Sequence, residues 1–300
     1  MSPEMIAELG SEKDSIGSKP VRTVVEYLRE IGDHDAADSL DPTGAAGQAF
    51  GINWGPEVWG HTGMLLGFIP STTEGDGTEI QNAARIAADV SLKDARVRIS
   101  LDRFYVHKYP GRGRHKILLE FGGKNQIPGD PEELRFILPV EANDQATAAV
   151  TGVPIFIGAS VGRNGLAFEG KSVNVSSSHD EGLLAALQSG PFKEGLSLLT
   201  SAQPALKPFI GIAQGIVSAL LKRQQNKTIH YFKLGLDFAA GQTGARLREG
   251  SFIVLQSDQP NWSWEEVAWN AGLQQIVRRY DWQPIEYNYL IFRVSRFDGE

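Results

Sequence analysis

Apolar and polar residues alternate along much of the chain, first between about residues 96 and 176 and then at 229–256 and 285–296. In residues 97–101, Val, Ile and Leu are separated by Arg and Ser, and residues 232–238 repeat this period with Phe and Leu. Successive side chains of a strand point to opposite faces of a sheet, so this period predicts half-buried antiparallel strands. The expected fold class is α+β: mainly an antiparallel β-sandwich with helical insertions and a helical N-terminal region.

Two local signals refine the strand prediction. The alternation slips at Asp102-Arg103, which indicates a β-bulge. Asn164-Gly165, between two apolar runs, is typical of a two-residue hairpin turn. The expected strands cover residues 64–69, 96–108, 116–121, 134–140, 146–150, 154–161, 166–168, 172–176, 229–238, 247–256 and 286–296.

Helical periodicity is clearest near the N-terminus. Five apolar residues between positions 21 and 31 fall on one face of a helix, and Gly32 follows as a stop signal. A second short helix is expected over residues 34–40. Ser263 and Glu266 form a capping box ahead of a late helix at about 264–279. The remaining expected helices cover residues 80–90, 181–188, 193–200 and 204–225.

Charge changes sign sharply along the chain. Residues 1–92 carry 15 acidic and 5 basic residues, whereas residues 93–116 carry 8 basic and 2 acidic residues. This predicts an acidic, mainly helical or irregular N-terminal region over 1–92. A β-sandwich-like domain is then expected over 93–300, with a helical insertion at about 180–226 and a C-terminal helix and strand. The sign change also suggests two surfaces of opposite charge that fit each other.

The basic stretch is a candidate binding surface for a partner or a phosphate group. Basic residues interleaved with Tyr105 and Tyr109 suit phosphates or single-stranded nucleic acid. The net charge of the whole chain is −7, which favours docking to an acidic protein surface and does not favour nucleic acid. The candidate residues are Arg98, Arg103, Lys108, Arg112, Arg114 and Lys116.

Residues 208–221 have almost no polar face and are expected to form an apolar packing helix that includes Phe209. Gly211, Gly215 and Ala219 fall at i, i+4 and i+8, so they form a ridge of small residues that lets another backbone approach closely. At about 14 residues the run is too short to span a bilayer. It is expected to be a core helix or a subunit contact; release of this helix onto a membrane is the alternative.

Catalytic and metal-binding signals are weak. Gly158-Ala159-Ser160-Val161-Gly162 matches the G-x-S-x-G of serine hydrolases, but a second strand, not a helix, is expected after it. If Ser160 were a nucleophile, its candidate base and acid partners would be His179, Asp180, His230 and Asp237. With no cysteine and no metal-ligand spacing among six histidines, no metal site and no cofactor is expected.

The patterns together favour a non-enzymatic binding or assembly protein that acts through protein–protein contacts, with a protein partner or with a second copy of itself. The alternatives are a membrane-active protein, pore-forming or lipid-binding but not integral, and a serine hydrolase that uses Ser160. The first residues lack the basic start and apolar core of a signal peptide, so a cytoplasmic protein is expected.

Overall fold

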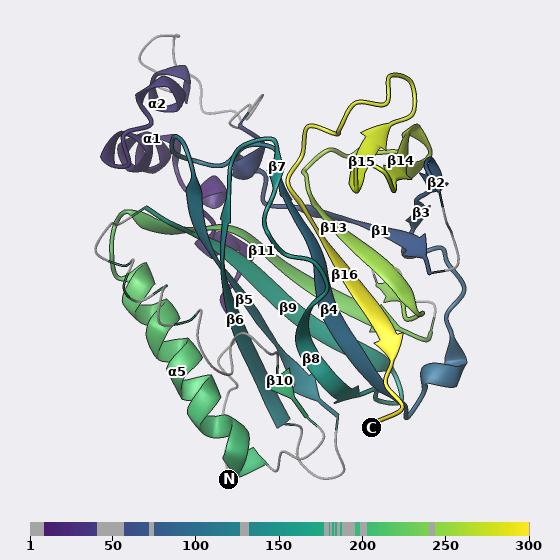
Figure 1. Cartoon of the computed structure of the whole chain (residues 1–300). Coiled ribbons are helices and arrows are strands. Elements are labelled where there is room, and N and C mark those ends of the chain that lie inside the picture. Colours follow the sequence, from purple (N-terminus) through teal and green to yellow (C-terminus); the bar gives the residue numbers. More distant parts are fainter. Residues whose placement is uncertain are drawn as a thin grey trace.

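The structure is a computed structural model of the chain (Figure 1). It describes residues 9–40, 57–71, 75–126, 132–176, 196–198, 203–239 and 244–299, together with Asp180, Gly182, Leu184 and Leu187. For residues 203–209 only the backbone is described.

The largest element is an eight-stranded sheet, called sheet A, with the strand order β10-β8-β4-β16-β13-β1-β3 and β7 paired to β4. All its pairs are antiparallel except β10 with β8. Its strands are β1 (Met64–Pro70), β3 (Gln81–Asn82), β4 (Arg96–Val106), β7 (Ala146–Thr147), β8 (Val153–Ser160), β10 (Leu196–Ser197), β13 (Gly250–Gln256) and β16 (Tyr289–Arg296).

A five-stranded sheet, sheet C, packs face to face on sheet A, with the order β12-β11-β9-β5-β6. Phe292 of sheet A contacts Phe121, Phe168 and Phe232 of sheet C, with ring centroids 5.3 to 5.7 Å apart. The predicted antiparallel sandwich of the α+β class is therefore confirmed. The strands of sheet C are β5 (His115–Asn125), β6 (Glu132–Ala142), β9 (Gly165–Val175), β11 (Asn226–Asp237) and β12 (Ala245–Arg246).

Each outer face of the sandwich carries a further layer. A three-stranded sheet, sheet B, covers half of the outer face of sheet A through a second core that includes Ile253, Ile291 and Ile276. Helix α5 (Gln203–Leu221) lies on the outer face of sheet C, where Val217 and Leu220 pack on Leu118 and Ile137 (Figure 1). The strands of sheet B are β2 (Thr78–Glu79), β14 (Val267–Asn270) and β15 (Gln275–Arg278).

The two predicted N-terminal helices are present and pack at one end of the sandwich: α1 (Val21–Glu30) and α2 (His34–Leu40) (Figure 1). Gly32 ends α1 with a φ of 79°, a left-handed conformation that glycine adopts without strain. Val24 and Leu28 are fully buried in the same core cluster as the facing strands of sheets A and C. The predicted division into regions 1–92 and 93–300 stays a prediction, although the two share this core.

The predicted helix at 264–279 is wrong. Ser263 does cap a turn, by accepting from the Glu265 backbone N–H, but only the short 3-10 helix Trp264–Glu266 follows. The chain then forms the β14–β15 hairpin, in which Trp269 lies opposite Ile276. Leu273 and Tyr280, which a helix over 264–279 would place on the same face as Trp269 and Ile276, are 55% and 78% exposed. In so short a segment, apolar residues that face each other across a hairpin imitate a helical period.

Three other predictions need correction. Residues 80–90 form no helix, because β3 and a turn occupy 81–86, and the 3-10 turn Val90–Leu92 follows. Within the predicted helix 193–200, residues 196–197 are β10, which runs parallel to β8.

The turn at Asn164-Gly165 exists, with mutual hydrogen bonds between Gly162 and Gly165. However, it joins β8 of sheet A to β9 of sheet C and closes no hairpin, because the core separates these strands. The predicted helix 181–188 lies largely outside the described residues.

Candidate functional site

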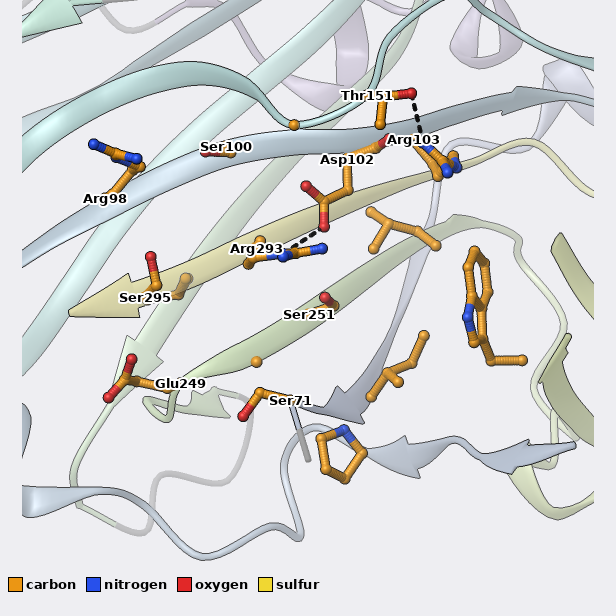
Figure 2. A pocket seen from close by; sticks show the side chains of 17 residues that line it. Ser71, Arg98, Ser100, Asp102, Arg103, Thr151, Glu249, Ser251, Arg293 and Ser295 are labelled. Atoms are coloured by element: carbon orange, nitrogen blue, oxygen red, sulfur yellow. Dashed lines mark hydrogen bonds and ion pairs between the residues drawn. The ribbon is translucent and has the colours of Figure 1, made fainter. Parts of the chain in front are cut away.

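The outer face of sheet A has an apolar half under sheet B and a polar half that is open. The polar half forms a groove of about 680 Å³ at the border with sheet B (Figure 2). Its charged and hydroxyl-bearing lining comes mainly from β4, β16 and β13, with contributions from the ends of neighbouring loops. These residues are Ser71, Arg98, Ser100, Asp102, Arg103, Thr151, Glu249, Ser251, Arg293 and Ser295.

Strand register places the lining residues in rows across the groove. Arg293 of β16 lies between Ser100 of β4 and Ser251 of β13. In the next row, Arg98 lies opposite Ser295. Because diagonal neighbours on one face of an antiparallel pair are about 7–8 Å apart, Arg98 and Arg293 can contact two groups of one ligand.

The predicted bulge in β4 is confirmed and shapes the groove. Arg103 pairs with Ile291 and Leu101 pairs with Phe292, so Asp102 is the extra residue on β4. A bulge interrupts the strict alternation of faces. Consequently both Asp102 and Arg103 line the groove, although they are consecutive in the chain.

Ion pairs and hydrogen bonds hold the charged groups of the groove in place. Asp102 Oδ2 accepts from Arg293 Nε at 2.8 Å, and the side chains are 12% and 62% exposed, respectively. The buried Arg103 donates to Thr151 Oγ1 at 2.8 Å and to Gln274 Oε1. Arg103 therefore connects β4 to the loop at 151 and to the β14–β15 turn of sheet B, so it positions two walls of the groove.

The groove offers more hydrogen-bond donors than the protein uses. Among the described residues, the hydroxyl groups of Ser71, Ser100, Ser251 and Ser295 make no hydrogen bond with one another or with other protein atoms. The Arg98 guanidinium lies 5.3 Å from the centre of the Phe297 ring, which fixes its position through a cation–π contact. By contrast, both carboxylates already accept hydrogen bonds: Asp102 from Arg293, and Glu249 from the Arg296 backbone N–H.

The six basic residues predicted as one surface lie in separate places. Arg98 and Arg103 line the groove, whereas Arg112, Arg114 and Lys116 line a smaller hollow of about 200 Å³ beside α1. Acidic side chains contact three of them: Asp35 lies 2.6 Å from Arg112, Glu141 lies 2.8 Å from Arg114, and Glu57 lies 3.3 Å from Lys108. Two of these acids belong to the acidic N-terminal region.

The small-residue ridge of α5 does not pack on the sandwich. Gly211, Gly215 and Ala219 are exposed, and a Cβ atom added at either glycine would meet nothing within 4 Å. The helix packs instead through Ala213, Val217 and Leu220. The side chain of Phe209 lies outside the described residues. In the described part of the chain, no helix has the length and apolar character needed to cross a membrane.

Ser160 has none of the surroundings of a nucleophile in the described structure. It ends β8, and its backbone N–H donates to Asn125 Oδ1. The turn to β9 follows in place of a helix. Asp180 binds Arg223 and Asn226, and His230 lies against the Gly63 carbonyl oxygen, so neither contacts Ser160. His179 lies outside the described residues. Within the described ranges, no group of three His, Asp or Glu residues could hold a metal ion.

Sequence reasoning found Arg98, Arg103 and the bulge but missed the rest of the groove. The signal that could have found it is the kind of polar residue at outward strand positions: Ser occurs in β4, β13 and β16, and Arg in β4 and β16. No protein-family model, curated protein or solved structure matches this chain. The geometry of the groove is therefore the basis for a functional proposal.

Proposed function

We propose that the protein is a non-enzymatic binding protein that holds an extended, negatively charged, oxygen-rich ligand in the groove on the outer face of sheet A. The observation that carries this proposal is the excess of donors: four serine hydroxyl groups and the Arg98 and Arg293 guanidinium groups face one groove. A ligand rich in acceptor oxygens matches this set.

The donors are held in place before a ligand arrives. Asp102 restrains Arg293, and Phe297 restrains Arg98, which lowers the side-chain entropy lost on binding. Asp102 already pairs with the Arg293 guanidinium group and Glu249 already accepts from a backbone N–H, so both carboxylates have a donor before the ligand binds. Charge-assisted hydrogen bonds to each arginine contribute about 1.5–3 kcal/mol.

The sequence also predicts a protein partner or self-association, and we keep both in this proposal: an acidic segment of another protein, or of a second copy of this chain, could be the ligand. An acidic peptide has the carboxylates that the groove is suited to bind, so it belongs in the test. The predicted cytoplasmic location also stays a prediction, and the proposal does not depend on it.

Isothermal titration calorimetry with three acidic probes tests the proposal: hexaglutamate, a galacturonate tetramer and an octathymidylate. We expect at least one probe to bind, and Arg293→Gln to weaken that binding about tenfold or more, because a charged hydrogen bond is lost. Arg22→Gln is the matched control, since Arg22 is exposed on α1, away from the groove. Absence of binding by all three probes, or equal binding by R293Q, contradicts the proposal.

A further inference from the structure

The position of the groove narrows the class of ligand. It lies on the face of sheet A, where the backbone groups of β4, β16 and β13 are already paired within the sheet. Peptides that bind sheets gain most of their affinity from backbone hydrogen bonds at an exposed edge. A peptide that crosses this face could form hydrogen bonds only with side chains, because the backbone groups of the sheet are already paired.

The described edges of the two large sheets are also poor sites for strand addition. In sheet A the outermost strands, β10 and β3, have two residues each. In sheet C, β12 has two residues, and the longer edge strand β6 contains Pro139, which has no backbone N–H to donate. These edges disfavour an extended peptide as the ligand.

The charge of the groove also disfavours nucleic acid. Its lining has three guanidinium groups, of Arg98, Arg103 and Arg293, against the carboxylates of Asp102 and Glu249. Arg103 is buried and occupied by protein acceptors. A nucleic acid brings one negative charge with every nucleotide. The groove would therefore bring Glu249, which has no guanidinium partner among the described residues, close to a dense row of phosphates, in a chain of net charge −7.

A sparsely charged, hydroxyl-rich ligand fits both the position of the groove on the sheet face and the charge of its lining. Serine hydroxyl groups donate and accept, so they can exchange hydrogen bonds with hydroxyl groups of a sugar. Trp269, a half-buried residue of β14, lines the groove at its border with sheet B. An indole presents a broad apolar face with a polar edge, which suits the apolar face of a pyranose ring.

We infer, on the basis of the proposed function, that the ligand of the groove is an oligosaccharide with widely spaced acidic groups. Arg98 and Arg293 bind the acidic groups, the hydroxyl groups of Ser100, Ser251 and Ser295 bind sugar hydroxyl groups, and Trp269 stacks on a ring. The acidic group is a carboxylate or a sulfate ester, because either accepts hydrogen bonds from a guanidinium group.

Calorimetric affinities of four probes test this inference: a galacturonate tetramer, a chondroitin sulfate tetrasaccharide, neutral maltotetraose and hexaglutamate. We expect at least one acidic saccharide to bind about tenfold or more tightly than both maltotetraose and hexaglutamate. The first two probes distinguish a carboxylate from a sulfate. If hexaglutamate binds as tightly as either saccharide, in a manner that depends on Arg293, the inference is overturned and the proposed function stands. If none of these four probes binds, the inference is overturned; the proposed function is overturned with it only if octathymidylate also fails to bind.

Two variants separate stacking from general damage to the fold. Trp269→Leu keeps an apolar side chain against the second core. We expect it to weaken the binding of the saccharide that binds most tightly about tenfold. The matched control, Trp282→Leu, removes a 47% exposed indole that does not line the groove, and should leave the affinity unchanged. Ser251→Ala combined with Ser295→Ala should weaken binding without changing the melting temperature. Unchanged affinity in both groove variants overturns the inference.

Discussion

At the scale of single residues, His230 is a buried ionisable group whose pKa is strongly shifted by its surroundings. It is fully buried in β11, and its Nε2 lies 3.2 Å from the Gly63 carbonyl oxygen. Burial lowers the pKa of His230 to about 4. Gly63 and Thr62 also bind Asp258: Asp258 Oδ1 accepts from the Gly63 backbone N–H, and Asp258 Oδ2 accepts from the Thr62 backbone N–H. Burial raises the pKa of the Asp258 carboxyl group, but the His61 hydrogen bond and these backbone N–H groups together outweigh it and lower that pKa.

The depressed pKa of His230 makes the free energy of unfolding depend on pH. Between pH 6.5 and 4.5 the unfolded chain binds a proton at His230 that the folded chain does not, so stability falls as pH falls. We expect His230→Gln to remove about 2 kcal/mol of this loss, measured by urea unfolding at the two pH values. His34→Gln, at an exposed position on α2, is the control. An equal loss in H230Q and in the natural chain would show that another group titrates.

At the scale of elements, the sequence predicts best what is local. The bulge at Asp102 breaks the alternation within one strand, so it is visible without knowledge of any partner. The pattern of the β14–β15 hairpin predicts a helix because Trp269 and Ile276 meet only across the hairpin. The groove cannot be predicted for the same reason: Ser100, Arg293 and Ser251 become neighbours through pairing of β4, β16 and β13, which no single strand reveals.

The contribution of a residue of helix α5 to stability depends on which face of the helix it occupies. The exposed ridge of Gly211, Gly215 and Ala219 makes no contact that a larger side chain would break. We expect Gly215→Ala to raise the free energy of unfolding by up to about 1 kcal/mol, because alanine favours a helix. Leu220→Ala, on the buried face, should lower it by about 2–5 kcal/mol. Both values come from chemical denaturation. A destabilising G215A would instead show that the ridge is packed.

At the scale of the whole molecule, four layers follow one another: α5, sheet C, sheet A and sheet B. The N-terminal helices join the central core and not a core of their own. Acidic residues of these helices bind the basic turn of the sandwich, since Asp35 pairs with Arg112 and Asp33 accepts from the Gly111 backbone N–H. Part of the charge asymmetry seen in the sequence is therefore satisfied within one chain.

Because α1 shares the central core, we expect the chain to unfold in one cooperative transition. Leu28→Ala should lower the free energy of unfolding by about 2–5 kcal/mol, since Leu28 is fully buried. Tryptophan fluorescence and far-ultraviolet circular dichroism should report the same shifted midpoint in this variant. An early, separate transition in L28A would show instead that residues 1–92 form an independent unit.

The most direct test of the central claim, that the groove on sheet A binds the ligand, is backbone amide chemical-shift mapping with the acidic probe that binds most tightly. We expect the largest shifts in β4, β13 and β16 and at residues 151–152, all of which border the groove. Shifts centred on residues 110–116 would locate binding at the basic turn beside α1. That result, or no shifts at saturating probe, would contradict the claim that the groove is the binding site.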